Sequence, residues 1–205
     1  MADLIIKPTS GGSLKLQEDG GTDAISVGTD GQSTITQIHS ASKFPTGHII
    51  QVQSLTLSSA QEKTSPTANT WFDIPSFTLN ITPSATSSKV MVMVVMSIGQ
   101  DESEEVGMRL MRGSPAIGIG DAAGNRTRVS TSARMDAGSS SDYRTLQRMI
   151  HHLDSPSTTS ATTYKVQWRA MYNTDHLYLN RDYQWNDDDD RSASISTITL
   201  MEVAG

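Results

Sequence analysis

The chain consists mainly of short segments in which apolar and polar residues alternate, with turn-forming residues between them. The range Thr163–Tyr172 alternates: one face carries Tyr164, Val166, Trp168, Ala170 and Tyr172, and the other carries Lys165, Gln167 and Arg169. A period of two is typical of a strand with one buried and one solvated face. Turn sequences such as Thr82-Pro83-Ser84 and Asp154-Ser155-Pro156 separate these segments. No segment shows a convincing helical period, so we expect an all-β chain.

Ten segments beyond the first forty residues are expected to be strands. They are Ile49–Leu57, Trp71–Ile81, Lys89–Ile98, Val106–Arg112, Ala116–Ile119, Thr127–Ala133, Thr145–His152, Thr163–Tyr172, His176–Asn180 and Ser194–Val203. Many short strands at this spacing predict an antiparallel β-sandwich, most simply a jelly roll. The composition agrees, because charged residues make up only 19% of the 205 residues and serine and threonine are abundant.

The first forty residues contain a repeat with a spacing of eleven residues. The sequence LKLQEDG at 14–20 aligns with ISVGTDG at 25–31, and each unit is a short alternating strand followed by Asp-Gly, which favours a tight reversal. A third, degraded unit follows at Thr34 to Ile38. Strands this short bury too little apolar surface to fold alone, so we expect them to pack on other copies of the chain or on a partner surface. The alternative is a disordered polar tail.

We therefore expect two parts: an N-terminal β-repeat arm over residues 1–42 and a jelly-roll sandwich over residues 43–205. The arm is expected to attach the protein to a larger assembly and to intertwine the subunits. The apolar residues expected to make this contact are Leu4, Ile6, Leu14, Leu16, Ile25 and Val27.

One expected strand has no polar face. The run Val90–Met96 places apolar side chains on both sides, whereas a strand in an antiparallel sandwich normally has one solvated side. Such a strand needs a second cover, and another subunit is the simplest one; a loop or the N-terminal arm is the alternative. We expect a homotrimer, with the subunit interface at Val90, Met91, Val92, Met93, Val94, Val95 and Met96.

Composition and motifs argue against several functional classes. There is no cysteine, which excludes disulfide scaffolds and thiol catalysis. The net charge is −6, so we expect no nucleic-acid partner. We read no signal peptide, and no apolar run approaches the roughly 20 residues that span a bilayer, so no membrane partner is expected. His151 and His152 alternate faces, and no acid/base pair stands out, so we expect neither an enzyme nor a cofactor.

The segment before the last strand contains two features that suggest ligands. Asp187, Asp188, Asp189 and Asp190 form an oxygen-rich run that a calcium ion could use. Consecutive side chains on an extended backbone alternate faces, however, so we expect a solvated loop and no metal. Tyr183 and Trp185 lie in the same acidic loop and are the aromatic residues expected to be exposed, as contacts to a receptor such as a host surface glycan.

Three regions of the sequence resemble virion structural proteins of marine tailed phages, including cyanophages and pelagiphages. The first is the repeat LKLQEDGG (14–21) and ISVGTDGQSTI (25–35). The second is KVMVMVV (89–95) after TPSATSS (82–88), and the third joins LYLNR (177–181) to STITLMEV (196–203). The resemblance implies a jelly-roll trimer that serves as a capsid decoration or a fibre-type protein.

Three functions follow from this reading. The first is a capsid decoration (cement) or head-fibre protein that binds and stabilises the shell of major capsid protein. The second is a short tail fibre or receptor-binding protein attached to tail adaptor or nozzle proteins. The third is a carbohydrate-active enzyme on a jelly-roll fold. A chain of 205 residues has room for one anchor and one domain without a long shaft, which favours the first. We expect a protein of the virion surface, assembled in the host cytoplasm.

Overall fold

The computed structural model divides the chain into two compact units, Met1–Phe44 and Pro45–Gly205. In the second unit it describes residues 45–100, 105–134, 145–171, 176–189 and 191–205, with Gln100 as backbone only. In the first unit it describes the backbone of three strands. Within these ranges there is no helix with the length and apolar character needed to cross a membrane.

The first unit contains a three-stranded antiparallel sheet. Its strands are β1 (Leu14–Gln17), β2 (Asp23–Val27) and β3 (Ser33–Ile35), and β2 lies in the middle. The register places Leu14 opposite Val27 and Leu16 opposite Ile25. The repeat of eleven residues thus coincides with successive antiparallel strands. Its proposed role in attachment stays a prediction, and Leu4 and Ile6 lie outside the described residues.

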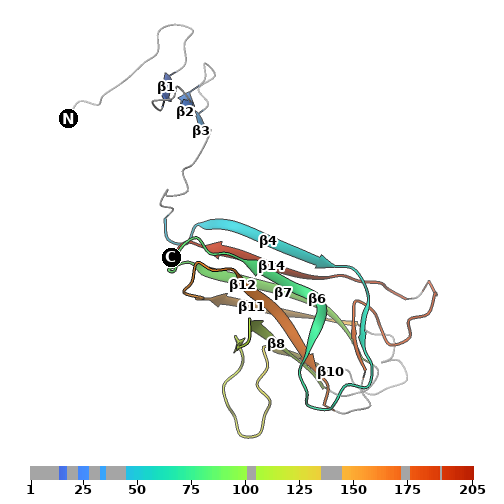
Figure 1. Cartoon of the computed structure of the whole chain (residues 1–205). Coiled ribbons are helices and arrows are strands. Elements are labelled where there is room, and N and C mark those ends of the chain that lie inside the picture. Colours follow the sequence, from blue (N-terminus) through green and yellow to red (C-terminus); the bar gives the residue numbers. More distant parts are fainter. Residues whose placement is uncertain are drawn as a thin grey trace. The chain divides into compact units, whose positions relative to one another are not determined.

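The second unit is an antiparallel β-sandwich of two sheets (Figure 1). The six-stranded sheet contains β4 (Ile49–Leu57), β14 (Ser196–Val203), β7 (Lys89–Gln100), β13 (Leu177–Leu179) and β5 (Gln61–Lys63) in that order, with β11 (Thr145–Asp154) also paired to β7. The five-stranded sheet contains β10 (Thr131–Arg134), β8 (Glu105–Arg112), β12 (Thr162–Arg169) and β6 (Phe72–Ile81), with β9 (Ala116–Ile117) also paired to β8. The predicted all-β antiparallel sandwich is confirmed.

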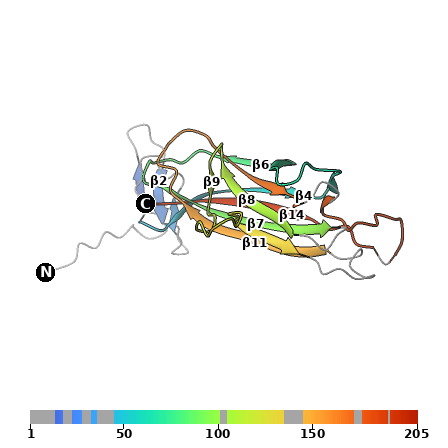
Figure 2. The ribbon, with the colours of Figure 1, turned by 90° about the horizontal axis from the view of Figure 1, so that it is seen from below.

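The eight longer strands pair in a nested order. The first, β4, pairs with the last, β14; the second, β6, pairs with β12; the third, β7, pairs with β11; and β8 pairs with β10. The chain therefore runs like one long hairpin that is folded over on itself. Figure 2 shows β14, β7 and β11 side by side in the sheet that this pairing creates.

The core fills the space between the two sheets. Its largest fully buried side chains include Trp168 and Tyr164 from β12 and Phe77 from β6. From the other sheet, Ile98 of β7 and Ile198 of β14 are completely buried. The alternation of β12 that was visible in the sequence is thus the inward face of the five-stranded sheet.

Some strand bounds differ from the expectation, for local physical reasons. The expected strand Thr127–Ala133 begins only at Thr131, because the residues before it form the return arm of a loop, where Ser130 N–H donates to Met108 O at 2.8 Å. The strand β5 was not expected, because Gln61–Lys63 is polar, charged and short. It forms because Leu177–Leu179 offers it an edge to pair with.

Candidate interaction surface

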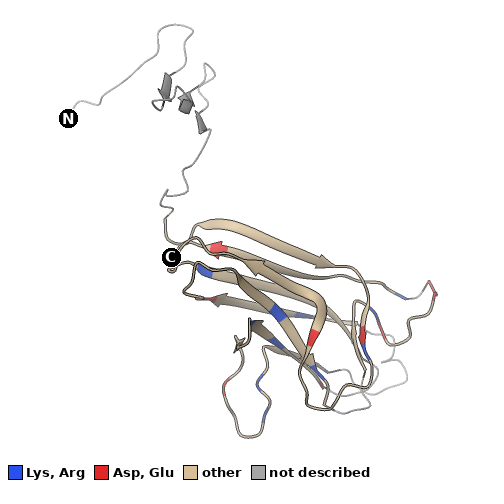
Figure 3. Ribbon diagram, viewed as in Figure 1, with Lys and Arg blue, Asp and Glu red and all other residues tan. Residues whose placement is uncertain are grey.

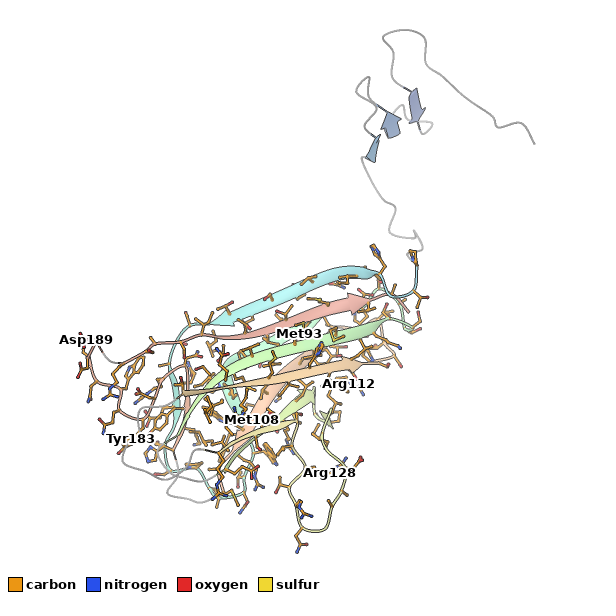
Figure 4. All side chains as sticks on the ribbon, turned by 180° about the vertical axis from the view of Figure 1, so that it is seen from behind. Met93, Met108, Arg112, Arg128, Tyr183 and Asp189 are labelled. Carbon is orange, nitrogen blue, oxygen red and sulfur yellow. The ribbon has the colours of Figure 1, made fainter. Side chains whose placement is uncertain are left out.

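The strand β7 contributes side chains to both faces of the six-stranded sheet. Val90, Val92, Val94 and Met96 are completely buried against the other sheet. The residues between them therefore point away from the core, and Met93, near the middle of the sheet, is 38% exposed (Figure 4). Of the seven residues expected at a subunit interface, only Met91, Met93 and Val95 are placed to contact another subunit.

Neighbouring strands extend this apolar face across the sheet. The register places Met201 of β14 opposite Met91, and Val52 of β4 opposite Met201. On the other side, Leu153 of β11 lies opposite Met91. Four apolar side chains from four strands therefore form one row, and the two at its ends, Val52 and Leu153, are exposed.

A second row contains Val95 of β7 and Met149 of β11, which are paired in the register. Met149 is 63% exposed, the highest value among the large apolar side chains of the described residues. Between the two rows, Met93 lies opposite Thr199 and His151. We name the resulting surface the outer apolar face. Its members are Val52, Met91, Met93, Val95, Met149, Leu153 and Met201.

This face is almost free of charge. The outward positions of β4, β7, β11 and β14 carry one formal charge, that of Lys89 at the start of β7. On the other sheet, β12 carries Lys165 and Arg169 and β6 carries Asp73, and Figure 3 colours basic residues blue and acidic residues red. A contiguous apolar surface on an otherwise polar chain is typical of a protein–protein contact.

A buried carboxylate fixes one end of β14 beneath this face. Glu202 is completely buried and points into the sandwich. It accepts hydrogen bonds from the side chains of Gln51 at 2.7 Å, Ser84 at 2.6 Å and Ser88 at 2.7 Å, and from the backbone N–H of Ser84 at 2.7 Å. Burial raises the pKa of Glu202. The hydrogen bonds from Gln51, Ser84 and Ser88 together lower it by more than burial raises it, so the pKa lies below its ordinary value. The ionised carboxylate therefore ties the 84–88 turn to β14 and β4.

A second buried carboxylate fixes the end of β11. Asp154 accepts a hydrogen bond from the Tyr164 hydroxyl at 2.6 Å and pairs with Arg112 at 2.9 Å. Burial, followed by the bond to Asp154 and its negative charge, raises the pKa of Tyr164 far above the ordinary value. The phenol therefore stays protonated and links β12 of one sheet to β11 of the other. Both carboxylates are therefore engaged in contacts that hold strands of the sandwich together.

The expected receptor residues lie in the loop between β13 and β14, and they are exposed. Tyr183 is 40% and Trp185 44% exposed, and Tyr183 lies at one end of the sandwich (Figure 4). The Arg181 guanidinium donates to the Tyr183 carbonyl at 3.0 Å and lies 5.4 Å from the Trp185 ring. Arg181 therefore braces the loop, and the two aromatic side chains remain predicted receptor contacts.

The aspartate run follows directly in the same loop. Asp187, Asp188 and Asp189 are exposed, and Asp190 lies outside the described residues. Within the described ranges, no group of three or more histidine, aspartate or glutamate side chains is placed to hold a metal ion. The three described carboxylates therefore face solvent.

Sequence reasoning did not find the contributions of Val52, Met149, Leu153 and Met201 to the outer apolar face. A signal was present in β11, where Met149 and Leu153 fall on the face opposite Ile150. The four strands are separated along the chain, however, and only their pairing reveals one surface.

Comparison with known proteins assigns no family. No protein-family model matches the chain, and no curated protein matches it. Among solved structures, one similar chain comes from the structure of infectious bursal disease virus Gx strain. It shares 11% identity with a TM-score of 0.38, and the match covers 78% of this chain but 39% of that one. A likeness this weak carries no argument about function.

Proposed function

We propose that this protein is a homotrimeric structural subunit of a tailed-phage particle, most simply a capsid decoration protein that binds and stabilises the major capsid shell. The outer apolar face is the observation that carries the self-association. The nested strand pairing supports a jelly-roll domain, because pairing first with last and second with seventh is the connectivity of a rolled-up hairpin. The regions that resemble marine phage virion proteins supply the assignment to the particle.

A second copy of the chain is the partner that best suits the face. A chain with net charge −6 repels its own copies, so self-association requires contact where charges are absent. The outer apolar face meets this condition, since no acidic side chain lies on it.

The face by itself supplies a modest association energy. Four side chains of the face are between 38% and 63% exposed: Val52, Met93, Met149 and Leu153. Burying the exposed part of each side chain therefore contributes about half the free energy of burying a whole one. The total is roughly 3–6 kcal/mol per subunit at about 1.5–3 kcal/mol for each fully buried side chain. Association costs about 4–15 kcal/mol, so we expect the N-terminal repeats to contribute the remainder.

The subunit contact is tested by Met93→Asp. The exposed position should tolerate a carboxylate in the monomer, whereas a trimer would bury three unpaired charges at several kcal/mol each. Light scattering should therefore give a trimer for the wild type and a monomer for the variant. Thr78→Asp places the same charge on exposed β6 and should leave the trimer intact. A wild-type monomer at micromolar concentration would contradict the trimer, and a trimeric Met93→Asp would place the interface elsewhere.

The capsid role is tested on particles with and without the protein. Many bound trimers should raise the temperature at which packaged DNA is released, because a ligand of the assembled state stabilises it. Deleting residues 1–40, or replacing Leu16 and Val27 with Asp, should abolish docking if the N-terminal repeats are the anchor. An unchanged release temperature without the protein would rule out a cement role. A copy number that matches the symmetry of the tail would then favour the short tail fibre.

A further inference from the structure

The outward face of the five-stranded sheet has the opposite character to the outer apolar face. The Arg109 guanidinium donates to Gln167 Oε1 from Nε at 2.9 Å and from Nη2 at 2.6 Å. Gln167 Nε2 donates to Asp73 Oδ1, and Lys165 Nζ donates to Asp73 Oδ2, both at 2.7 Å. Polar side chains on three strands are therefore connected across this face, which is solvated.

A polar groove lies at one end of this face. Its volume is about 460 Å³, within the range of small-molecule sites. Its walls come from the turn before β6, the ends of β8 and β12, and the loop between β9 and β10. The lining residues are Asn69, Glu105, Gly107, Asn125, Arg126, Thr127, Val129, Arg169 and Met171.

Gly107 allows the groove walls to meet. A Cβ at this position would lie 3.1 Å from Cγ1 of Val129, 3.3 Å from Cγ of Arg169 and 3.5 Å from the Trp71 ring. A side chain here would therefore push apart the loop and the strand that form the floor. Glycine leaves this space open. The Arg169 guanidinium lies 5.7 Å from the centre of the Trp71 ring.

Backbone hydrogen bonds hold both walls in place without a ligand. On one side, Asn69 adopts a positive φ of 58°, and its N–H donates to Ala170 O at 2.9 Å. On the other side, Gly120 N–H donates to Val129 O at 3.1 Å, closing the loop that projects with Arg128 in Figure 4. A preformed groove loses less conformational freedom when it binds a ligand.

The described lining of the groove carries two positive charges and one negative charge, although the chain as a whole is acidic. Arg126 and Arg169 face one carboxylate, Glu105. Arg169 lies against the Trp71 ring and interacts electrostatically with Glu105, but among the described residues its guanidinium donates no hydrogen bond. Arg126 makes one long bond, from Nη1 to Ala123 O at 3.4 Å. Both guanidinium groups therefore keep donors for a ligand.

We propose that this groove binds a carboxylated saccharide. A guanidinium fork matches the geometry of a carboxylate, and the side chains of Asn69, Asn125 and Thr127 offer donors and acceptors for hydroxyl groups. Glu105 accepts from sugar hydroxyls but repels a doubly charged phosphate. Saccharide binding in this groove is independent of the proposed structural role, and the isolated protein is sufficient to test it.

The test is calorimetric titration of the full-length protein with trigalacturonate, with neutral maltotriose and inorganic phosphate as comparison ligands. Trigalacturonate should bind, and maltotriose and phosphate should bind at least about tenfold more weakly. Arg169→Gln should weaken trigalacturonate binding by about tenfold or more, the effect expected when a hydrogen bond to a charged group is lost. Lys89→Gln removes the same charge from the other sheet, outside the groove, and should bind like the wild type.

Arg126→Gln, in the exposed loop, gives an independent measurement if Arg169→Gln lowers the folded fraction. It should also weaken binding by about tenfold. The proposal is overturned if trigalacturonate does not bind at about 10 mM, tenfold above a weak dissociation constant of about 1 mM. It is equally overturned if Lys89→Gln weakens binding as much as the groove variants, or if phosphate binds as well as trigalacturonate.

Discussion

Replacing Glu202 with glutamine should destabilise the sandwich, because four hydrogen bonds converge on this buried carboxylate. Oε1 accepts from the backbone N–H and hydroxyl of Ser84 and from the hydroxyl of Ser88, and Oε2 accepts from Gln51 Nε2. The glutamine amide would oppose the Gln51 amide with two donor groups. If Gln51 turned its amide to accept, it would lose its bond to Thr82 O, which is 2.7 Å long.

The expected loss in the free energy of unfolding is roughly 2–4 kcal/mol. A hydrogen bond to a charged group contributes about 1 kcal/mol more than a neutral one, so four bonds set an upper limit of about 4 kcal/mol. The neutral amide is cheaper to bury than the carboxylate, which offsets part of this loss. The backbone N–H of Ser84 cannot compensate, because it can only donate a hydrogen bond.

The effect should depend on pH in a defined direction. The pKa of Glu202 in the folded protein lies below its ordinary value of 4.5, so the ionised group stabilises the fold above that value. This stabilisation is lost as the pH falls below 4.5 and through the folded pKa. The difference between wild type and Glu202→Gln should therefore be largest near neutral pH and should shrink in acid.

The assay is urea denaturation of both proteins at about pH 7 and about pH 3.5, at one protein concentration. Glu62→Gln is the matched control, because Glu62 pairs with Arg181 near the surface and such pairs contribute about 0–1 kcal/mol. The reasoning is refuted if Glu202→Gln unfolds at the wild-type urea concentration at neutral pH. It is also refuted if the loss is the same at both pH values.

Two further substitutions test the packing of the sandwich. Gly99→Ala should destabilise the fold by about 1–3 kcal/mol or more, because a Cβ there would overlap the Arg181 carbonyl oxygen; a thermal melt that matches the wild type would contradict this close approach. Tyr164→Phe should cost about 1.5–3 kcal/mol, since it removes the hydroxyl that donates to buried Asp154 while Arg112 remains. Urea denaturation measures this loss, and a change below about 0.5 kcal/mol would show that the bond contributes little.

Residues adjacent in sequence largely determined where strands form. The expected Ile49–Leu57 matches β4 at both ends, and the alternation from Tyr164 to Trp168 correctly marks the inward face of β12. Alternation and turn chemistry are local properties, so they can be read without knowing the fold. The same reasoning placed exposed aromatic residues at Tyr183 and Trp185.

Only the tertiary structure decided which strands pair and therefore which surfaces exist. Val52 and Met201 lie in one row of the outer apolar face because β4 pairs with β14, a partner from the other end of the domain. Arg126 and Arg169 meet at the groove because the loop before β10 folds back over β8. The sequence does not show whether the spatial neighbours of a surface residue are polar or apolar, because strands that are distant in the sequence supply those neighbours. The sequence therefore determined the local alternation, and long-range pairing determined the sites.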